Sequence, residues 1–527
     1  MKKQFNSVMI ILIIISGLCF HKTSAQSITN VRMINLDFNQ VKGPYNTMFK
    51  ECVGAGRANE GLRADWQQQL IYVRKECGFK YIRMHGLLTD DMGVYREDKN
   101  GKPEYNFQYI DKLYDFILSI GMKPFVELGF MPEALASGKQ TIFWWRGNVT
   151  PPKDYKKWGE LIRNLTLHFS QRYGPDEVKT WYFEVWNEPN LSGFWTGTQD
   201  EYFKLYRYSV NAVKSVSKDF RVGGPATAGA AWEVDMIDFC RKNNLPLDFI
   251  STHAYGVKQG YLDEYGNSGT ILDSNPMSLS IDVLNSREEI AGSSMSDLEL
   301  HYTEWSSSYT PADPLHDSYH EAAYILEKLK RTGNAANSMS YWVFTDIFEE
   351  PGPRFTPFHG GFGLLNYQSI DKPAFYAYQF MNKLSNTELI NKDSSSWGCK
   401  DKNGNIQVLL WDFTYTLPDS VNNQDYYIRN LPSKLKGKVK INISEIPSGM
   451  YNLEVYQVGY RVNDPYTTYF DMGRPNQLTR EQVQEIKKLN NGSPIYTERI
   501  EVKNGTPFQK ELTIRENDVF LITLHKL

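Results

Sequence analysis

The chain has 527 residues, 41% apolar and 23% charged, which is long enough for a barrel-sized domain and a smaller module. Its 58 basic and 61 acidic side chains leave a net charge of −3, which gives no support for a nucleic acid or an anionic membrane as partner. Aromatic residues reach 14%, with 33 Tyr and 12 Trp. Most of these rings are expected in the core, but an excess of Trp and Tyr is also what a sugar-binding cleft needs.

The N-terminus is typical of a secretory signal peptide, expected over residues 1–25. Two lysines precede an apolar stretch, residues 8–20, which is too short to span a bilayer comfortably. Small residues then offer a cleavage site before Gln26. We expect an exported protein, periplasmic or extracellular, without a membrane span; lipid anchoring through Cys19 is the alternative.

Short apolar segments with strand character recur through residues 51–387, and segments with helical spacing separate them. In the first helical segment Trp66, Leu70, Val73 and Cys77 recur at intervals of three and four residues, and Asp65 is the expected N-cap. Further helices are expected at 154–173, 200–216 and 318–331. The strands are expected near Val53 and at 81–84, 124–128, 181–185, 222–225, 249–252, 298–303 and 339–344.

Strands that alternate with helices predict parallel βαβ units, and eight units imply a closed (β/α)8 barrel, a TIM barrel, over residues 51–387. A doubly wound open sheet is the second possibility. It usually carries a phosphate-binding glycine loop after its first strand. Here GAGRANEG (54–61) has Asn59 where G-x-G-x-x-G requires a third glycine, so the barrel is favoured.

Residues 388–527 have turn and strand patterns in place of the strand–helix alternation, and they predict an antiparallel, β-sandwich-like domain. KNGNIQVLLWDF (402–413) contains an Asn-Gly turn before a β-rich run, and the chain closes on a strand pattern. Thr479 and Gln482 form a capping-box helix start within this domain. We expect the N-terminal segment, residues 26–50, to pair with it.

Two glutamates stand at strand ends, where the chemistry of such barrels is located. Glu188 ends the predicted fourth strand and Glu304 the seventh, and these two strands face each other across the barrel mouth. Two opposed carboxylates are the arrangement that glycoside hydrolysis requires, one as acid and one as nucleophile or base. Asn187 is placed to hold the hydroxyl next to the reacting carbon.

Three long segments resemble glycoside hydrolase family 39, and its β-xylosidases in particular: WYFEVWNEPNLSGFW (181–195), HYTEWSSSYTPADPLHDSYHEAAYI (301–325) and SYWVFTDIFEEPGPRFTPFHGGFGLL (340–365). Further matching motifs extend the resemblance over nearly the whole mature chain. It implies a retaining mechanism through a covalent glycosyl–enzyme, with Glu188 as general acid/base, Glu304 as nucleophile and their carboxyl groups about 5 Å apart.

The resemblance also implies a set of residues around the terminal sugar: His85, Asn187, Phe194, His253, Tyr255, Trp342, Glu349 and Glu350. There are two departures from the family pattern. Ser306 follows Trp305 where the family's β-xylosidases tend to carry Asn, and Arg146 stands where an acidic residue is familiar. A cation at the cleft rim would select an anionic or larger sugar, which leaves the sugar open.

No metal site is expected, because the chain has no H-E-x-x-H and the spacing of Cys52, Cys77, Cys240 and Cys399 fits no zinc site. The lack of G-x-S-x-G argues against a serine nucleophile, and no cofactor is expected because acid, nucleophile and water suffice. Buried free thiols are favoured for these four, although export permits disulfides. The predicted function is release of terminal β-D-xylose from xylo-oligosaccharides, by a protein for which a homo-oligomer is the alternative to a monomer. The alternatives are a family-39 glycosidase acting on an arabinose, galactose or uronide linkage, and a sugar-binding barrel without turnover.

Overall fold

The structure is a computed structural model that describes residues 31–415, 417–418 and 420–527. The predicted signal peptide, Cys19 and the start of the N-terminal segment lie outside the described residues.

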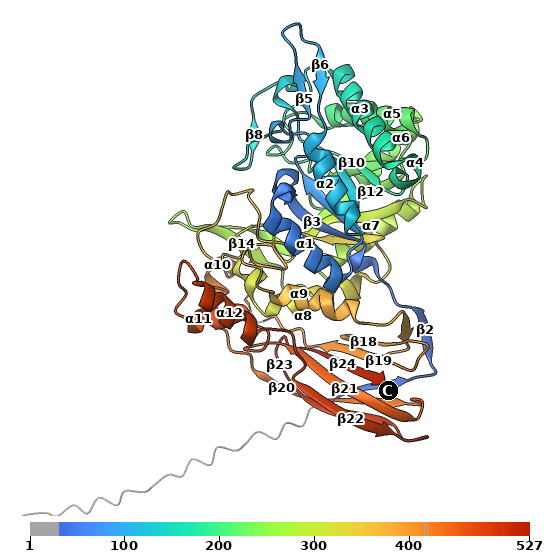
Figure 1. The fold of residues 1–527 in the computed structure, drawn as a ribbon, viewed down its shortest axis with the longest axis vertical. Helices are drawn as coiled ribbons and strands as arrows, with labels where there is room; N and C mark the ends of the chain where they lie inside the picture. Colours follow the sequence, from blue (N-terminus) through green and yellow to red (C-terminus); the bar gives the residue numbers. More distant parts are fainter. Residues whose placement is uncertain (1–30, 416, 419) are drawn as a thin grey trace, which may run out of the picture.

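Eight parallel strands close into a barrel, which forms the upper part of the molecule in Figure 1. Each strand pairs with the next along the chain, and the last pairs with the first through Tyr341 and Val53. This confirms the predicted closed barrel over the open sheet. The strands are β3 (Cys52–Arg57), β4 (Tyr81–His85), β7 (Lys123–Leu128), β10 (Tyr182–Val185), β11 (Arg221–Thr227), β12 (Phe249–Tyr255), β15 (Glu299–Ser306) and β16 (Ser338–Tyr341).

Helices follow the strands and cover the barrel, as the apolar spacing predicts. Asp154 caps α3 by accepting the backbone N–H groups of Lys156 and Lys157. The helices are α1 (Ala64–Cys77), α2 (Gln108–Ser119), α3 (Tyr155–Tyr173), α4 (Pro175–Val178), α5 (Gln199–Val216), α6 (Glu233–Asn243), α7 (Ser280–Gly292), α8 (His320–Thr332) and α9 (Pro373–Asn382).

The predicted N-cap of α1 is wrong. Arg63 occupies the cap position, and Asp65 lies inside the first turn. The Asp65 carboxylate accepts two hydrogen bonds from the Arg63 guanidinium and one from the backbone N–H of Trp66. A carboxylate in the first helical turn is stabilised there by the helix dipole without serving as the cap.

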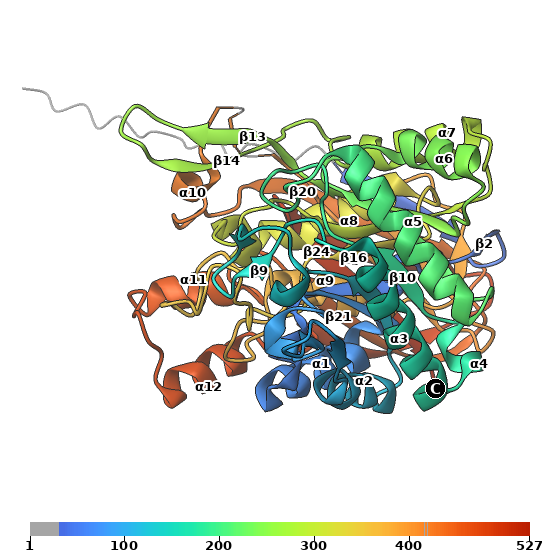
Figure 2. The same ribbon diagram turned by 90° about the horizontal axis from the view of Figure 1, so that it is seen from above.

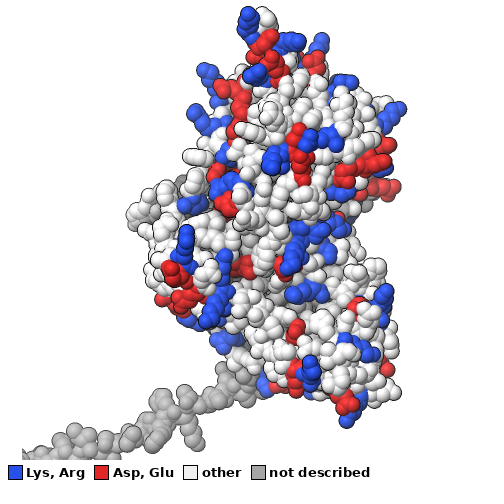
Figure 3. All heavy atoms as spheres, in the orientation of Figure 1, with Lys and Arg blue, Asp and Glu red and all other residues white. Residues whose placement is uncertain are grey.

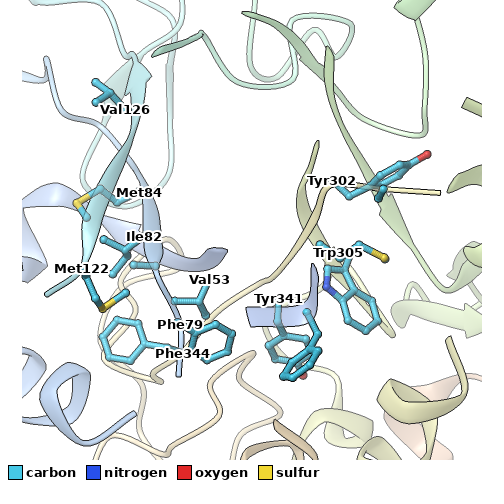
Figure 4. Packing of buried hydrophobic residues seen from close by; sticks show 14 of the residues in the cluster. Val53, Phe79, Ile82, Met84, Met122, Val126, Tyr302, Trp305, Tyr341 and Phe344 are labelled. Carbon is cyan, nitrogen blue, oxygen red and sulfur yellow. The ribbon is translucent and has the colours of Figure 1, made fainter. Parts of the chain in front are cut away.

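The largest apolar core fills the layer between the strands and the surrounding helices, whereas the inside of the barrel holds buried charged residues beneath its mouth. Val53, Ile82, Met84 and Val126 come from successive strands, and Tyr302 comes from β15 on the other side (Figure 4). Such packing holds the strand ends in fixed positions, which a catalytic site at the barrel mouth requires.

The lower part of the molecule in Figure 1 is a pair of sheets that share a second core, which gives the predicted sandwich. Thr479 and Gln482 form the predicted capping box of α12 (Arg480–Leu489). The seven-stranded sheet contains β2 (Val41–Pro44), β17 (Thr387–Leu389), β18 (Ser396–Lys400), β19 (Ile406–Trp411), β24 (Val519–Lys526), β21 (Gly449–Val458) and β22 (Tyr496–Val502). The three-stranded sheet contains β1 (Val31–Asp37), β20 (Leu435–Ser444) and β23 (Phe508–Arg515).

Both ends of the described chain contribute to this sandwich. Strand β1 pairs in parallel with β20, and β2 pairs antiparallel with β17. Residues 31–44 therefore lie with the C-terminal sheets rather than with the barrel that follows them in the sequence.

Small hairpins and helices decorate the barrel loops. The β13–β14 hairpin projects outward in Figure 2, and α10 braces its base because the side chains of Asn423 and Gln424 accept hydrogen bonds from the backbone of β14. The remaining elements are β5 (Tyr95–Glu97), β6 (Pro103–Tyr105), β8 (Thr141–Ile142), β9 (Gly147–Asn148), β13 (Val257–Leu262), β14 (Ser268–Leu272), α10 (Asn423–Tyr426) and α11 (Pro465–Asp471).

The four cysteines after the signal region, Cys52, Cys77, Cys240 and Cys399, are all buried and free in the structure, as favoured from the sequence. None of the helices in the described part of the chain is long and apolar enough to cross a bilayer. Acidic and basic side chains are interspersed over the face shown in Figure 3, in keeping with the small net charge.

Candidate active site

Glu188 lies in the turn that follows β10, at the barrel mouth. The backbone of Trp186 has φ 71° and that of Glu188 has φ 44°, both in the left-handed region that such residues rarely adopt. The backbone N–H of Glu188 donates to the carbonyl oxygen of Ala226, 2.8 Å away on the neighbouring strand β11. Backbone strain of this kind costs about 1–3 kcal/mol per residue and persists where the surrounding structure enforces it.

Glu304 lies inside β15, two residues before the strand ends. Its Oε1 accepts from Arg83 at 2.7 Å, and its Oε2 accepts from the Tyr255 hydroxyl at 2.7 Å. Both donors are held in the barrel wall, so they fix the orientation of the carboxylate before a substrate arrives.

The two carboxylates meet across the pocket. One oxygen of Glu188 and one of Glu304 lie within 4.8 Å of each other. Retaining glycosidases hold their two carboxyl groups about 5–5.5 Å apart, whereas inverting enzymes leave about 6.5–9.5 Å for a water molecule. The geometry therefore fits the retaining arrangement predicted for this pair.

The pKa of Glu188 is raised to about 7, chiefly by burial; Arg83 opposes the shift and Glu127 contributes to it. His253 Nδ1 lies 2.9 Å from Glu188 Oε1, and burial lowers the pKa of His253. A neutral imidazole adds no positive charge that would favour the ionised form of Glu188. Glu188 can thus remain protonated close to neutral pH, as a general acid requires.

Arg83 is fully buried beneath the site and joins the side chains of its floor. It donates to Glu184 at 2.5 Å and to Asn187 Oδ1 at 2.9 Å, and its guanidinium lies 3.0 Å from Glu127. Because the Asn187 oxygen is taken by Arg83, the Asn187 amide NH2 is left to donate into the pocket.

A pocket of about 780 Å³ opens above this floor. His85 lies at its base, with Nδ1 2.7 Å from Glu127 and Nε2 3.4 Å from Glu304; burial lowers its pKa to about 3. Six further residues named from the sequence line the pocket together with Glu188 and Glu304: His85, Asn187, Phe194, Tyr255, Trp342 and Glu350.

Comparison with known proteins gives one consistent result. The model of glycosyl hydrolases family 39 matches residues 32–502. The chain belongs to glycosyl hydrolase family 39. A β-xylosidase of Caldicellulosiruptor saccharolyticus is 38% identical over 501 residues, which cover 94% of this chain and 98% of that protein.

Solved structures of the family superimpose closely. The GH39 enzyme from Xanthomonas axonopodis pv. citri has a TM-score of 0.92 at 40% identity and covers 96% of this chain and 99% of its own. A monomeric β-xylosidase from Caulobacter crescentus CB15 has a TM-score of 0.91 at 41% identity, with 94% and 100% covered.

Three residues discussed from the sequence lie away from the pocket of this family-39 protein. His253 is fully buried behind Glu188 and acts on it rather than lining the pocket. Glu349 does not line the pocket; its carboxylate bridges Arg57 at 2.7 Å and Arg63 at 3.0 Å. Arg146 is exposed and is absent from the lining, so it places no cation at the pocket wall.

Sequence reasoning missed the buried charges under the site and much of the outer wall. Arg83 and His85 are two residues apart on β4, so strand alternation alone would have aimed both into the barrel. Glu127 and Glu184 are register partners on β7 and β10. Several apolar wall residues carried no signal of their own: Ile142, Phe143, Leu191, Val257, Tyr309 and Phe362.

Glu349 and Glu350 are adjacent in the sequence but differ in what they contact. We expect Glu350→Ala to lower kcat/KM about 10–100-fold, because it removes a pocket-lining group that can hydrogen-bond substrate, worth about 1.5–3 kcal/mol. Glu349→Ala should lower kcat/KM less than about fivefold but cost about 1–3 kcal/mol of stability by leaving Arg57 and Arg63 without their shared acceptor. Steady-state kinetics and thermal unfolding of both variants separate the two effects; equal losses of kcat/KM would contradict this assignment.

Glu60 is a buried carboxyl group that makes stability depend on pH. It lies in a 3-10 helix (Ala58–Leu62), and burial raises its pKa to about 8. Between its unfolded pKa near 4.3 and about 8 the folded state retains a proton that the unfolded state releases, so stability falls as the pH rises through this window.

We expect Glu60→Gln to flatten that fall by up to about 1.4 kcal/mol per pH unit. Tm measured from pH 5 to pH 9 tests this, with Glu288→Gln, an exposed carboxylate on α7, as the control. An unchanged slope in Glu60→Gln would show that Glu60 is already ionised in the folded state.

Glu188, His253 and Glu304 each offer an atom that can ligate a metal ion, and these atoms lie within 4.8 Å of one another. Proton transfer by Glu188 and nucleophilic attack by Glu304 also require the two carboxylates to lie this close together. A proton held on Glu188 would compete with a bound cation. We therefore expect dialysis against EDTA to leave hydrolysis unchanged. A loss of activity that Zn²⁺ or Mn²⁺ restores would assign a metal to this cluster.

Proposed function

We propose that this chain is a retaining β-xylosidase that releases terminal β-D-xylose from xylo-oligosaccharides. The observation that carries the proposal is the approach of Glu188 and Glu304 to within 4.8 Å at the base of a pocket walled by aromatic rings. The family membership and the 38% identity to a β-xylosidase support the reaction and the sugar.

In the first step Glu304 attacks the anomeric carbon while Glu188 protonates the departing oxygen, so a xylosyl ester forms on Glu304. The Asn187 amide donates to the neighbouring hydroxyl of the sugar, a contact that strengthens as positive charge develops in the transition state. In the second step Glu188, now ionised, takes a proton from water, which attacks the same carbon and frees Glu304.

The walls of the pocket bear on the choice among sugars. Among the described residues that line it there is no Lys or Arg. Arg83 lies beneath the floor and is shared among Glu127, Glu184 and Glu304. A uronic acid would place its carboxylate beside Glu188, Glu304 and Glu350 without a counter-charge, so the pocket favours a neutral sugar over a uronide.

The test is a screen of nitrophenyl glycosides (β-xyloside, α-arabinofuranoside, β-galactoside and α-iduronide), with NMR of the first-formed anomer. We expect the β-xyloside to be cleaved fastest, with net retention. Faster release from another sugar would overturn the specificity, and inversion would overturn the mechanism. No release from any glycoside would favour a sugar-binding barrel without turnover.

Export is part of the same proposal and is supported by the N-terminal sequence pattern alone. Mass spectrometry of the protein recovered outside the cytoplasm should show a chain that begins at Gln26. A diacylglycerol-modified Cys19 at the N-terminus would replace secretion with lipid anchoring.

A further inference from the structure

The pocket is divided by chemistry into an inner and an outer part. The charged and amide side chains of the lining lie deep in the pocket: His85 and Asn187 are 1–2% exposed, Glu188 and Glu304 are 4–7% exposed, and the partly buried Glu350 lies 3.5 Å from His85. The rim is far more open, with Leu191 at 40% and Tyr309 at 49%. The polar groups therefore surround the sugar to be released, and the rim meets the group attached to it.

The outer part of the lining is apolar. Phe143 and Phe194 pack against each other there, with ring centroids 5.5 Å apart. The other members are Ile142, Leu191, Val257 and Tyr309. Tyr255 and Trp342 also belong to the inner part, because the Tyr255 hydroxyl donates to Glu304 and the Trp342 ring lies against His85. Among the remaining described lining residues, the Tyr309 hydroxyl is the one side-chain group that can hydrogen-bond.

Two amide side chains on the same loops are engaged elsewhere. Asn190 donates to the carbonyl oxygen of Ala228 at 2.8 Å and accepts from its N–H at 2.9 Å. Gln140 donates to the carbonyl oxygen of Ser192 at 2.8 Å. These two amides stabilise the loops, so they do not add to the Tyr309 hydroxyl as partners for the hydroxyl groups of a second sugar.

We propose that the rim is an aglycone subsite for apolar alcohols, so that alkyl and aryl β-xylosides are substrates alongside xylo-oligosaccharides. The proposal rests on the proposed β-xylosidase function and names the class of leaving group that the same site accepts. Covering large apolar side chains that are half-exposed at a pocket mouth lowers the free energy of the complex. Such side chains therefore bind apolar surface more favourably than hydroxyl groups.

The experiment is a series of methyl, butyl and hexyl β-D-xylosides. Their alcohols differ little in acidity, so a change in kcat/KM reports burial of the chain rather than leaving-group chemistry. We expect kcat/KM to rise about fourfold for each methylene that enters the pocket, the equivalent of about 0.8 kcal/mol per methylene, and at least about tenfold in total from methyl to hexyl.

The double variant Leu191→Ala/Tyr309→Ala should flatten the series, because it removes the apolar rim. Tyr265→Ala is the matched control, since Tyr265 is 83% exposed on the β13–β14 hairpin and does not line the pocket. It should keep the full chain-length dependence.

A series that is flat within twofold in the unaltered enzyme would overturn the subsite. The same is true if the rim double variant keeps the slope of the control. Failure to release xylose from any of the three glycosides or from xylobiose would overturn the β-xylosidase function instead, so the two failures are distinguishable.

Discussion

Glu304→Gln is expected to lower kcat for an aryl β-xyloside by at least about four orders of magnitude, or about 5.5 kcal/mol of transition-state stabilisation. The amide cannot form the glycosyl ester, although it can still fill the space between Arg83 and Tyr255. Because the shape is preserved, thermal unfolding should change little. Glu288→Gln, on the surface of α7, is the control and should behave like the unaltered enzyme.

Chemical rescue makes this result specific to a nucleophile. In Glu304→Ala, azide can enter the vacated space and attack the sugar directly, which yields the α-xylosyl azide in a single inversion. NMR identifies that product. More than about a tenth of normal turnover in Glu304→Gln, or a β-azide from Glu304→Ala, would remove Glu304 from the nucleophile role.

Glu188→Gln is expected to lower kcat/KM for xylobiose by about 10²–10⁴-fold, the usual contribution of a general acid. A substrate with an acidic leaving group, such as a dinitrophenyl xyloside, needs less protonation and should lose less. The ratio between the two losses is the signature of an acid, since a residue that only binds the sugar would affect both substrates equally.

The pH profile gives a second readout of Glu188. Its pKa of about 7 requires kcat/KM to fall above pH 7, because the free enzyme then loses the proton that it must donate. This alkaline limb should vanish in Glu188→Gln for the dinitrophenyl substrate. A limb that persists at the same pH would assign the titration to another group, such as Glu127, whose pKa burial raises to about 8.

The barrel was predictable because each strand and helix has its own local spacing of apolar residues. The period of three and four in Trp66–Cys77 fixes α1 although the proposed cap was wrong, since a cap depends on single hydrogen bonds while the period depends on a whole buried face. The approach of Glu188 and Glu304 across the barrel mouth was predictable for a related reason. Strand counting places residues on opposite sides of a closed barrel without any knowledge of side-chain contacts.

What could not be predicted depends on contacts between loops. The family resemblance gave Glu349 and Glu350 the same expected role. In the structure Arg57 and Arg63 bind the carboxylate of Glu349, while that of Glu350 lies beside His85. The apolar rim brings together Phe143 of the segment between β8 and β9, Val257 of a hairpin and Tyr309 of a loop. Nothing in a single sequence states that these three segments converge.

The pairing of β1 with β20 determines when the first strand can fold during synthesis. Val31 lies against Lys438, and all seven residues of β1 have partners in the last quarter of the chain. A ribosome must therefore complete nearly the entire polypeptide before the first strand finds its place, and contacts of such long sequence separation form slowly. Until then Ile34 and Leu36, which end fully or almost fully buried, stay uncovered. Newly made chains should accordingly depend on chaperones at this strand, and an early pause in synthesis would favour aggregation over folding.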